Sequence, residues 1–120
     1  MEFNYKKENK DFNKRRQDYE RAKQKYPDKI PIICEKDSKV KMKDFVKTKF
    51  LAPLNSTVFE LFDQIRKIND IKKEEALFFL INGKHSINQN CNISEIYEKY
   101  HDEDGFLYIA YSKEIIWGSN

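Results

Sequence analysis

An unbroken run of apolar and aromatic residues at positions 106–111, FLYIAY, constrains the fold more than any other stretch. The run follows the pair Asp104-Gly105, which favours a turn. Such a run after a turn is typical of a strand buried in the core. Beyond it, the sequence contains a single glycine, Gly118, followed by Ser119-Asn120. The sequence therefore predicts a core strand that leads into a short tail containing a glycine.

Length and charge are those of a folded, single-domain protein. The 120 residues suffice for one domain, and 39% apolar against 36% charged residues favour a folded chain over a disordered one. Basic residues number 23 and acidic residues 20, which leaves a net charge of +3. A charge this small does not by itself indicate nucleic-acid binding, and we expect no specific nucleic-acid partner.

Three features bear on the cellular compartment and on membranes. Cys34 and Cys91 form no CxxC motif, which suits a reducing compartment. Residues 1–8 carry charges where a signal peptide needs an apolar core, and Glu2 in place of glycine excludes N-myristoylation. No stretch approaches the roughly 18 apolar residues of a membrane span. We therefore expect any membrane attachment to come from another source.

The first 27 residues predict an outer helix. Apolar residues there recur at spacings of seven, three and four: Phe12, Tyr19, Ala22 and Tyr26. Asp11 is a suitable N-cap and Pro27 ends the pattern. The apolar stripe is too narrow for a central helix, so we expect it outside a larger core. Residues 3–9 predict a separate helical turn.

Two strands are expected next. Residues 28–36 form a short, β-branched stretch that predicts a strand. Because proline cannot donate to a ladder, we expect this strand at an edge of the sheet, or at least unpaired at Pro31. Residues 48–53 predict a second strand. We expect the two to pair across the charged connection 37–47.

The strongest local signals lie in the second half. Thr57 and Glu60 form a capping box before a helix with a broad apolar face. An apolar strand at 74–81 is expected to be central, and Asn82-Gly83 after it predicts a type I′ turn. A second, shorter helix is expected to begin near Asn92.

The element order predicts an α+β fold of the ubiquitin-like β-grasp roll type. In this roll a mixed four-stranded sheet wraps a central helix, and here two extra N-terminal helices precede it. A ferredoxin-like fold needs a different element order. We expect an N-terminal helical extension at 1–27, a ubiquitin-like domain at 28–112 and a flexible tail at 113–120.

Motifs along nearly the whole chain then make a family resemblance specific. They are 12–16 FNKRR, 25–31 KYPDKIP, 33–36 ICEK, 49–53 KFLAP, 57–58 TV, 65–67 IRK, 75–79 EALFF and 104–112 DGFLYIAYS. In this collinear order they resemble the autophagy ubiquitin-like modifiers, the family of the microtubule-associated light-chain-3 and GABA-receptor-associated proteins. The GABA-receptor-associated branch is the most similar.

The resemblance gives the tail a chemistry. In this family a cysteine protease exposes a glycine carboxylate, which here is Gly118, by removing Ser119-Asn120. Activating and conjugating enzymes then transfer the carboxyl group to the amine of phosphatidylethanolamine. The resemblance thus implies no cofactor other than this covalent lipid, a cytoplasmic protein before conjugation, and autophagosomal and cytoplasmic vesicle membranes afterwards.

The resemblance also implies a binding site for aromatic-x-x-aliphatic motifs of cargo receptors and adaptors. Its aromatic pocket is expected to be lined by Asp18, Ala22, Pro31, Ile33, Lys49, Leu51 and Phe106. Its aliphatic pocket is expected to be lined by Phe50, Ala52, Pro53, Leu61, Gln64 and Ile65, with Arg66 as a charged neighbour. Lys29 and Lys49 are the expected contacts for acidic flanks.

Other residues predict no further chemistry. Cys34 is expected to be buried, the pair Phe78-Phe79 is expected in the core, and His85 and His101 are too few for a metal site. The sequence has no Gly-rich loop, nucleophile constellation or metal cluster, so we expect no enzyme and no catalytic residue. Two alternatives are an unconjugated adaptor in vesicle trafficking and a microtubule-binding protein. The tubulin contact of the second is the basic run at 14–16 together with the lysines of 21–29.

Overall fold

The computed structural model of the protein describes residues 1–113, and this part contains four helices and four strands. In chain order they are α1 (Asn4–Glu8), α2 (Phe12–Lys25), β1 (Lys29–Lys36), β2 (Lys49–Pro53), α3 (Val58–Ile68), β3 (Phe78–Ile81), α4 (Ile93–Tyr100) and β4 (Leu107–Ser112). None of these helices is long and apolar enough to cross a membrane. Gly118 and nearly all of the predicted tail lie outside the described residues.

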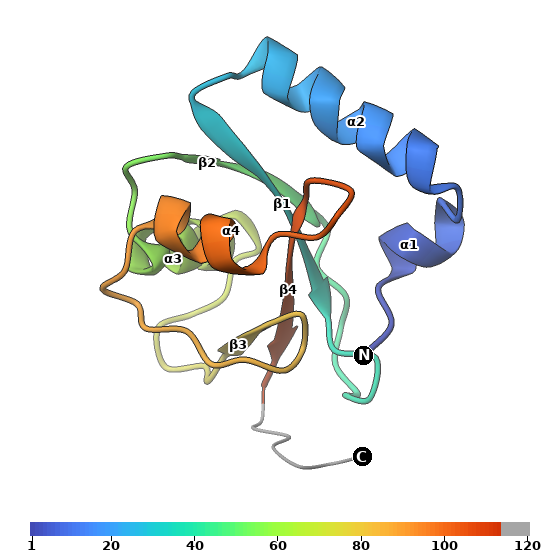
Figure 1. The fold of residues 1–120 in the computed structure, drawn as a ribbon. Coiled ribbons are helices and arrows are strands. Elements are labelled where there is room, and N and C mark those ends of the chain that lie inside the picture. The colour runs from blue at the N-terminus through green and yellow to red at the C-terminus, as the bar shows by residue number, and fades with distance from the viewer. Residues whose placement is uncertain (114–120) are drawn as a thin grey trace.

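The strands form one mixed sheet in the order β2-β1-β4-β3 (Figure 1). β1 pairs with β2, and β3 with β4, in antiparallel fashion, whereas the central strands β1 and β4 run parallel. Ile32 of β1 lies beside Phe50 of β2 and Leu107 of β4. The predicted α+β fold with a mixed four-stranded sheet and two N-terminal helices is thereby confirmed.

β3 lies at the outer edge of the sheet, so its predicted central position is wrong. β1 lies between β2 and β4 and not at an edge, but Pro31 has no partner in β4, which agrees with the alternative that the strand is unpaired at this residue. Pro31 is tolerated inside the sheet because β1 begins to pair with β4 only at the next residue, Ile32. The amide of Cys34 donates to the carbonyl of Thr48, so alternation along the strand turns the nitrogen of Pro31 away from β2.

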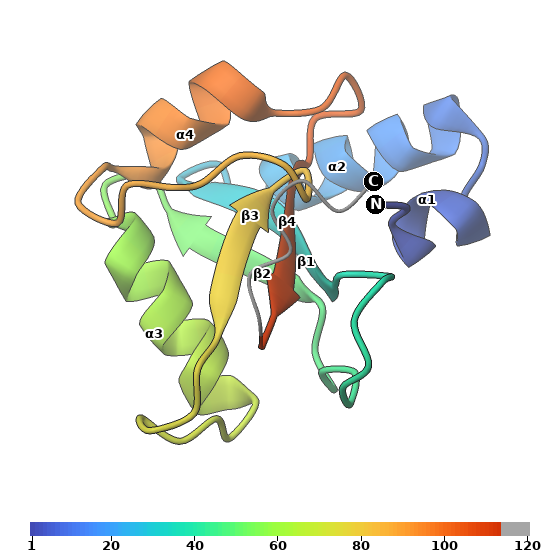
Figure 2. The same ribbon diagram turned by 90° about the horizontal axis from the view of Figure 1, so that it is seen from below.

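Each face of the sheet carries its own apolar cluster. The larger cluster buries α3 and α4 against one face and includes Leu61, Ile65 and Ile96. The smaller cluster, on the other face, consists of Phe3, Tyr5, Ile33, Phe106, Tyr108 and Ala110. Figures 1 and 2 show α1 and α2 on one side of the sheet and α3 on the other.

The local sequence signals correspond to structure. At the start of α3, the amide of Glu60 donates to the hydroxyl of Thr57, and the Glu60 carboxylate accepts from the Thr57 amide, both at 3.2 Å. Asp11 caps α2 as predicted. Asn82 and Gly83 have φ values of +55° and +72°, as a type I′ turn requires.

Two aromatic residues, Phe45 and Phe78, lie where the sequence does not predict them. Phe45, in the connection between β1 and β2, is buried and stacks on Tyr111 with ring centroids 3.6 Å apart. The prediction that Phe78 and Phe79 are both in the core is wrong for Phe78. Phe79 is buried against Phe62, but Phe78 points to the opposite face of the edge strand and is 40% exposed.

A buried polar cluster joins α2 to β4. The Asp104 carboxylate accepts hydrogen bonds from the Arg15 guanidinium at 2.9 Å, the Tyr108 hydroxyl at 2.6 Å and the Phe106 amide at 2.9 Å. The adjacent Gly105 has a φ of +102°, and a Cβ there would lie 2.3 Å from the ring of Tyr19. Only glycine fits this turn, both for its backbone conformation and for its contact with α2.

Candidate functional site

A groove of about 430 Å³ lies where α2 and α3 approach the β1–β2 edge of the sheet. It is lined by Asp18, Ala22, Lys29, Pro31, Ile32, Lys47, Lys49, Phe50, Leu51, Gln64 and Phe106. Every residue predicted for the aromatic pocket except Ile33 is among them. Ile33 is instead buried in the smaller cluster, together with Tyr5 and Phe106.

The residues predicted for the aliphatic pocket are divided between the groove and the core. Gln64 lines the groove, and Phe50 both lines it and belongs to the larger cluster. Ala52, Leu61 and Ile65 are buried in that cluster and do not line the groove. Pro53 is exposed at the end of β2.

Arg66, predicted as a charged neighbour of the aliphatic pocket, serves the backbone. Its guanidinium donates to the carbonyls of Lys72 at 3.3 Å and Glu75 at 3.0 Å, and more weakly to that of Leu77 at 3.5 Å. These bonds hold the segment between α3 and β3 in place, so the Arg66 side chain has a structural role.

Lysines give the groove a positive rim. Lys29 and Lys49, predicted as contacts for acidic flanks, both line it, and Lys47 joins them. Lys47 is not among the residues predicted for the groove; it lies just before β2, where strand alternation does not determine the direction of its side chain. The Lys47 ammonium lies 5.5 Å from the ring centroid of Phe50.

Among residues 1–113, Asp18 is the one acidic residue that lines the groove. Its carboxylate accepts from the Tyr5 hydroxyl at 2.7 Å and from Lys14 at 3.1 Å, and Arg21 lies 3.7 Å away. Burial opposes ionisation of this carboxyl, but the hydrogen bonds from Tyr5 and Lys14 and the charges of Lys14 and Lys49 outweigh it. The pKa of Asp18 therefore lies below its ordinary value.

The groove runs beside an open strand edge. β2 is the outermost strand on its side of the sheet, and no other strand of the described residues pairs with its outer edge. Because the amide of Cys34 donates to Thr48, antiparallel alternation directs the backbone groups of Phe50 towards β1 and those of Lys49 and Leu51 outward. An extended peptide can therefore add to the sheet beside the groove.

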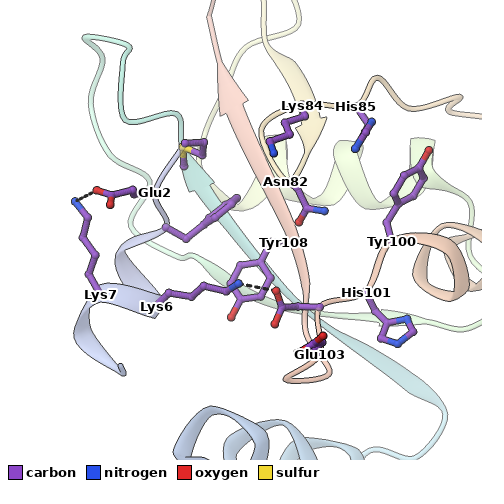
Figure 3. A pocket seen from close by; sticks show the side chains of 13 residues that line it. Glu2, Lys6, Lys7, Asn82, Lys84, His85, Tyr100, His101, Glu103 and Tyr108 are labelled. Carbon is purple, nitrogen blue, oxygen red and sulfur yellow. Dashed lines mark hydrogen bonds and ion pairs between the residues drawn. The ribbon is translucent and has the colours of Figure 1, made fainter. Parts of the chain in front are cut away.

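A second hollow, of about 740 Å³, lies between the N-terminal residues, the turn after β3 and the end of α4 (Figure 3). Both histidines line it: His85 lies beside Tyr100, and His101 follows α4. Its charges are mixed, and Lys7 pairs with Glu2 at 3.3 Å. Within residues 1–113, no group of three or more histidine, cysteine, aspartate or glutamate side chains could hold a metal ion.

The other candidate residues are buried or engaged in ion pairs. Cys34 is fully buried, and burial raises the pKa of its thiol. The basic run of α2 is engaged in ion pairs: Lys14 with Asp18, Arg15 with Asp104 and Arg16 with Glu20. This pairing leaves less unpaired charge for tubulin, whose binding stays a prediction.

Comparisons with known proteins agree with this architecture. The family model described as autophagy protein Atg8, ubiquitin-like, matches residues 14–118. The crystal structure of Trypanosoma brucei ATG8 is similar, with a TM-score of 0.78 and 36% sequence identity over 85% of this chain and 87% of that one. These findings do not separate the branches of the family, so the likeness to the GABA-receptor-associated branch stays a prediction. The chain belongs to the Atg8 family of ubiquitin-like autophagy proteins.

Proposed function

We propose that the protein is a conjugated tag of autophagy that docks cargo receptors and adaptors on membranes. The observation that carries this proposal is the lysine-rimmed groove beside the open edge of β2. Family membership supports the autophagy role. In this account the chain is a substrate of other enzymes and a binding platform, and it catalyses no reaction itself.

Docking follows from the groove. A partner segment in extended form adds to β2 through the outward backbone groups of Lys49 and Leu51, while its aromatic anchor enters the groove. Its aliphatic anchor lies three residues further on, towards the predicted residues Phe50 and Gln64. Lys29, Lys47 and Lys49 favour acidic residues flanking the motif.

Conjugation follows from the tail. Hydrolysis of the peptide bond between Gly118 and Ser119 frees the glycine carboxylate. Adenylation activates this carboxylate, a thiol of the pathway enzymes displaces the adenylate, and the amine of phosphatidylethanolamine displaces the thiol to form an amide. Glycine suits these steps because its backbone, without a Cβ, can enter a narrow enzyme groove. The lipid adds two acyl chains at once, which gives stable anchoring where one chain does not.

A peptide titration tests the docking half of the proposal. Wild-type protein is expected to bind an acidic-flanked aromatic-x-x-aliphatic peptide, and Lys49→Glu is expected to weaken binding by about 1–2 kcal/mol. The matched control is Lys73→Glu, at an exposed lysine that does not line the groove. Equal affinities of Lys49→Glu and wild type would remove Lys49 from the site.

A further inference from the structure

Helix α1 contacts three groove residues through one side chain, that of Tyr5. Its hydroxyl donates to the Asp18 carboxylate at 2.7 Å, and its ring lies 4.9 Å from the Lys49 ammonium. The same ring meets Phe106 edge-on, with centroids 5.3 Å apart. Tyr5 is only 6% exposed and does not itself line the groove. It therefore supports the groove from outside it.

The position of Tyr5 is fixed by contacts that are independent of the groove. No side chain of α1 caps its own N-terminus. Instead, the buried Glu35 carboxylate of β1 accepts from the Asn4 amide at 2.6 Å and from the Tyr5 amide at 3.0 Å. Phe3, just before the helix, packs on Tyr108 with ring centroids 5.0 Å apart. These contacts hold α1 against the sheet, so the Tyr5 ring has a defined place.

Tyr5 engages two groups of opposite charge that would otherwise attract each other. Asp18 and Lys49 both line the groove and interact electrostatically. Even so, no ion pair within the described residues joins them, because Asp18 accepts from Tyr5 and Lys14 while Lys49 lies against the Tyr5 ring. An exposed ammonium that is not bound to a carboxylate is available to an acidic partner.

We propose that Tyr5 is a positioning residue of the motif groove, which keeps Asp18 from pairing with Lys49 and so leaves Lys49 available to acidic residues flanking the motif. This inference rests on the proposed docking function. It makes α1 part of the recognition apparatus, although α1 lies outside the groove. It also predicts that substitution of Tyr5 changes the affinity for acidic peptides more than that for neutral ones. A purely structural role for Tyr5 predicts no such difference.

The test is a double-mutant cycle between Tyr5 and Asp18, read with two peptides. The peptides carry the same aromatic-x-x-aliphatic motif, one with acidic and one with neutral flanks. Tyr5→Phe keeps the ring but removes the hydroxyl, so Asp18 loses its shortest hydrogen bond. Among the described residues it then keeps only the exposed contacts with Lys14 and Arg21, and it can pair with Lys49 more readily. We expect this variant to lose about fivefold in affinity for the acidic peptide and less than twofold for the neutral one.

The second arm of the cycle is Asp18→Asn, whose amide cannot form the competing ion pair. In this background, Tyr5→Phe is expected to leave the affinity for the acidic peptide unchanged. Tyr100→Phe, which removes a hydroxyl at the second hollow, is the matched control and is expected to bind as wild type. Melting temperatures of all variants establish that they fold.

Two results would overturn the inference and leave the docking function intact. One is equal binding of the acidic peptide by wild type and Tyr5→Phe. The other is an equal loss for both peptides that persists in the Asp18→Asn background. A wild-type protein that binds neither peptide would instead overturn the docking function itself, and this inference with it.

Discussion

At the scale of single residues, the Asp104 carboxylate joins parts of the chain that are far apart in sequence. It is fully buried and holds Arg15 of α2 and the Tyr108 hydroxyl of β4. The Arg15 side chain is only 12% exposed. Removing the partner of a buried charge lowers the stability of the fold far more than removing the partner of an exposed charge. The sequence marks Asp104 only as part of a turn, because the partners that give it this role are distant in the chain.

Asp104→Asn is therefore expected to be strongly destabilising. The amide leaves the Arg15 charge buried without its counter-ion, and we expect the free energy of unfolding to fall by about 3 kcal/mol. Urea denaturation followed by circular dichroism measures this change. The control is Glu103→Gln at the adjacent exposed position, which is expected to change stability by less than about 0.5 kcal/mol. Equal midpoints for the two variants would contradict the role given to Asp104.

At the scale of elements, the sequence predicts what is locally encoded. The capping box of Thr57 and Glu60 and the turn at Asn82-Gly83 need only neighbouring residues, and both form as predicted. The order of strands in the sheet depends on long-range pairing. The central position predicted for β3 and the edge position considered for β1 fail because an apolar run and a proline identify a strand but not its neighbours. The local prediction for Pro31, that the strand is unpaired there, agrees with its lack of a partner in β4.

The groove shows the same difference between features that the sequence predicts and features that depend on long-range contacts. The family resemblance predicts most of its lining residues by position, whereas Lys47, which lies just before β2, carries no local signal for the groove. The contribution of α1 could not be predicted in this way. Its five residues are too few for a stable isolated helix, and its cap comes from Glu35, which lies 31 positions beyond Asn4.

Glu35→Ala is expected to release α1 while the sheet stays folded. Removing the acceptor of two backbone amides costs about 1–3 kcal/mol locally. This corresponds to at least fivefold faster hydrogen exchange at the α1 amides, such as those of Lys7 and Asn9. Exchange in β4 is expected to be unchanged. Glu8→Ala, at an exposed position of the same helix, is the control, and unchanged exchange at Lys7 in Glu35→Ala would contradict the capping role.

At the scale of the whole molecule, acidic groups fasten the N-terminal helices to the rest of the fold. Asp102 pairs with Lys6 of α1. Burial opposes its ionisation, but the hydrogen bond from Lys6, the Asp104 amide and nearby positive charges lower its pKa overall. The pKa of Asp18 is likewise lowered. Glu35 behaves in the opposite way, because burial raises its pKa more than the two α1 amides lower it.

These shifts set the sign of the pH dependence. Asp18 and Asp102 contribute stability that is present above their unfolded pKa of about 3.9 and is lost as pH falls through their lower folded values. Glu35 partly offsets this loss, because protonation favours its folded state. We expect the urea concentration at the unfolding midpoint to decrease as the pH is lowered below about 4. In Asp102→Asn this decrease is expected to be less steep. An equally steep fall in Asp102→Asn would contradict the role given to Asp102.

The central claim, that the protein is a tag conjugated through its tail, is tested most directly by mass spectrometry of its C-terminal peptide from cells in which autophagy is induced. We expect peptides that end at Gly118 and, in the membrane fraction, a phosphatidylethanolamine adduct on that residue. Gly118→Ala is expected to show neither and to stay out of the membrane fraction. Recovery of only unprocessed chains that continue beyond Gly118, from membrane and soluble fractions alike, would contradict the account.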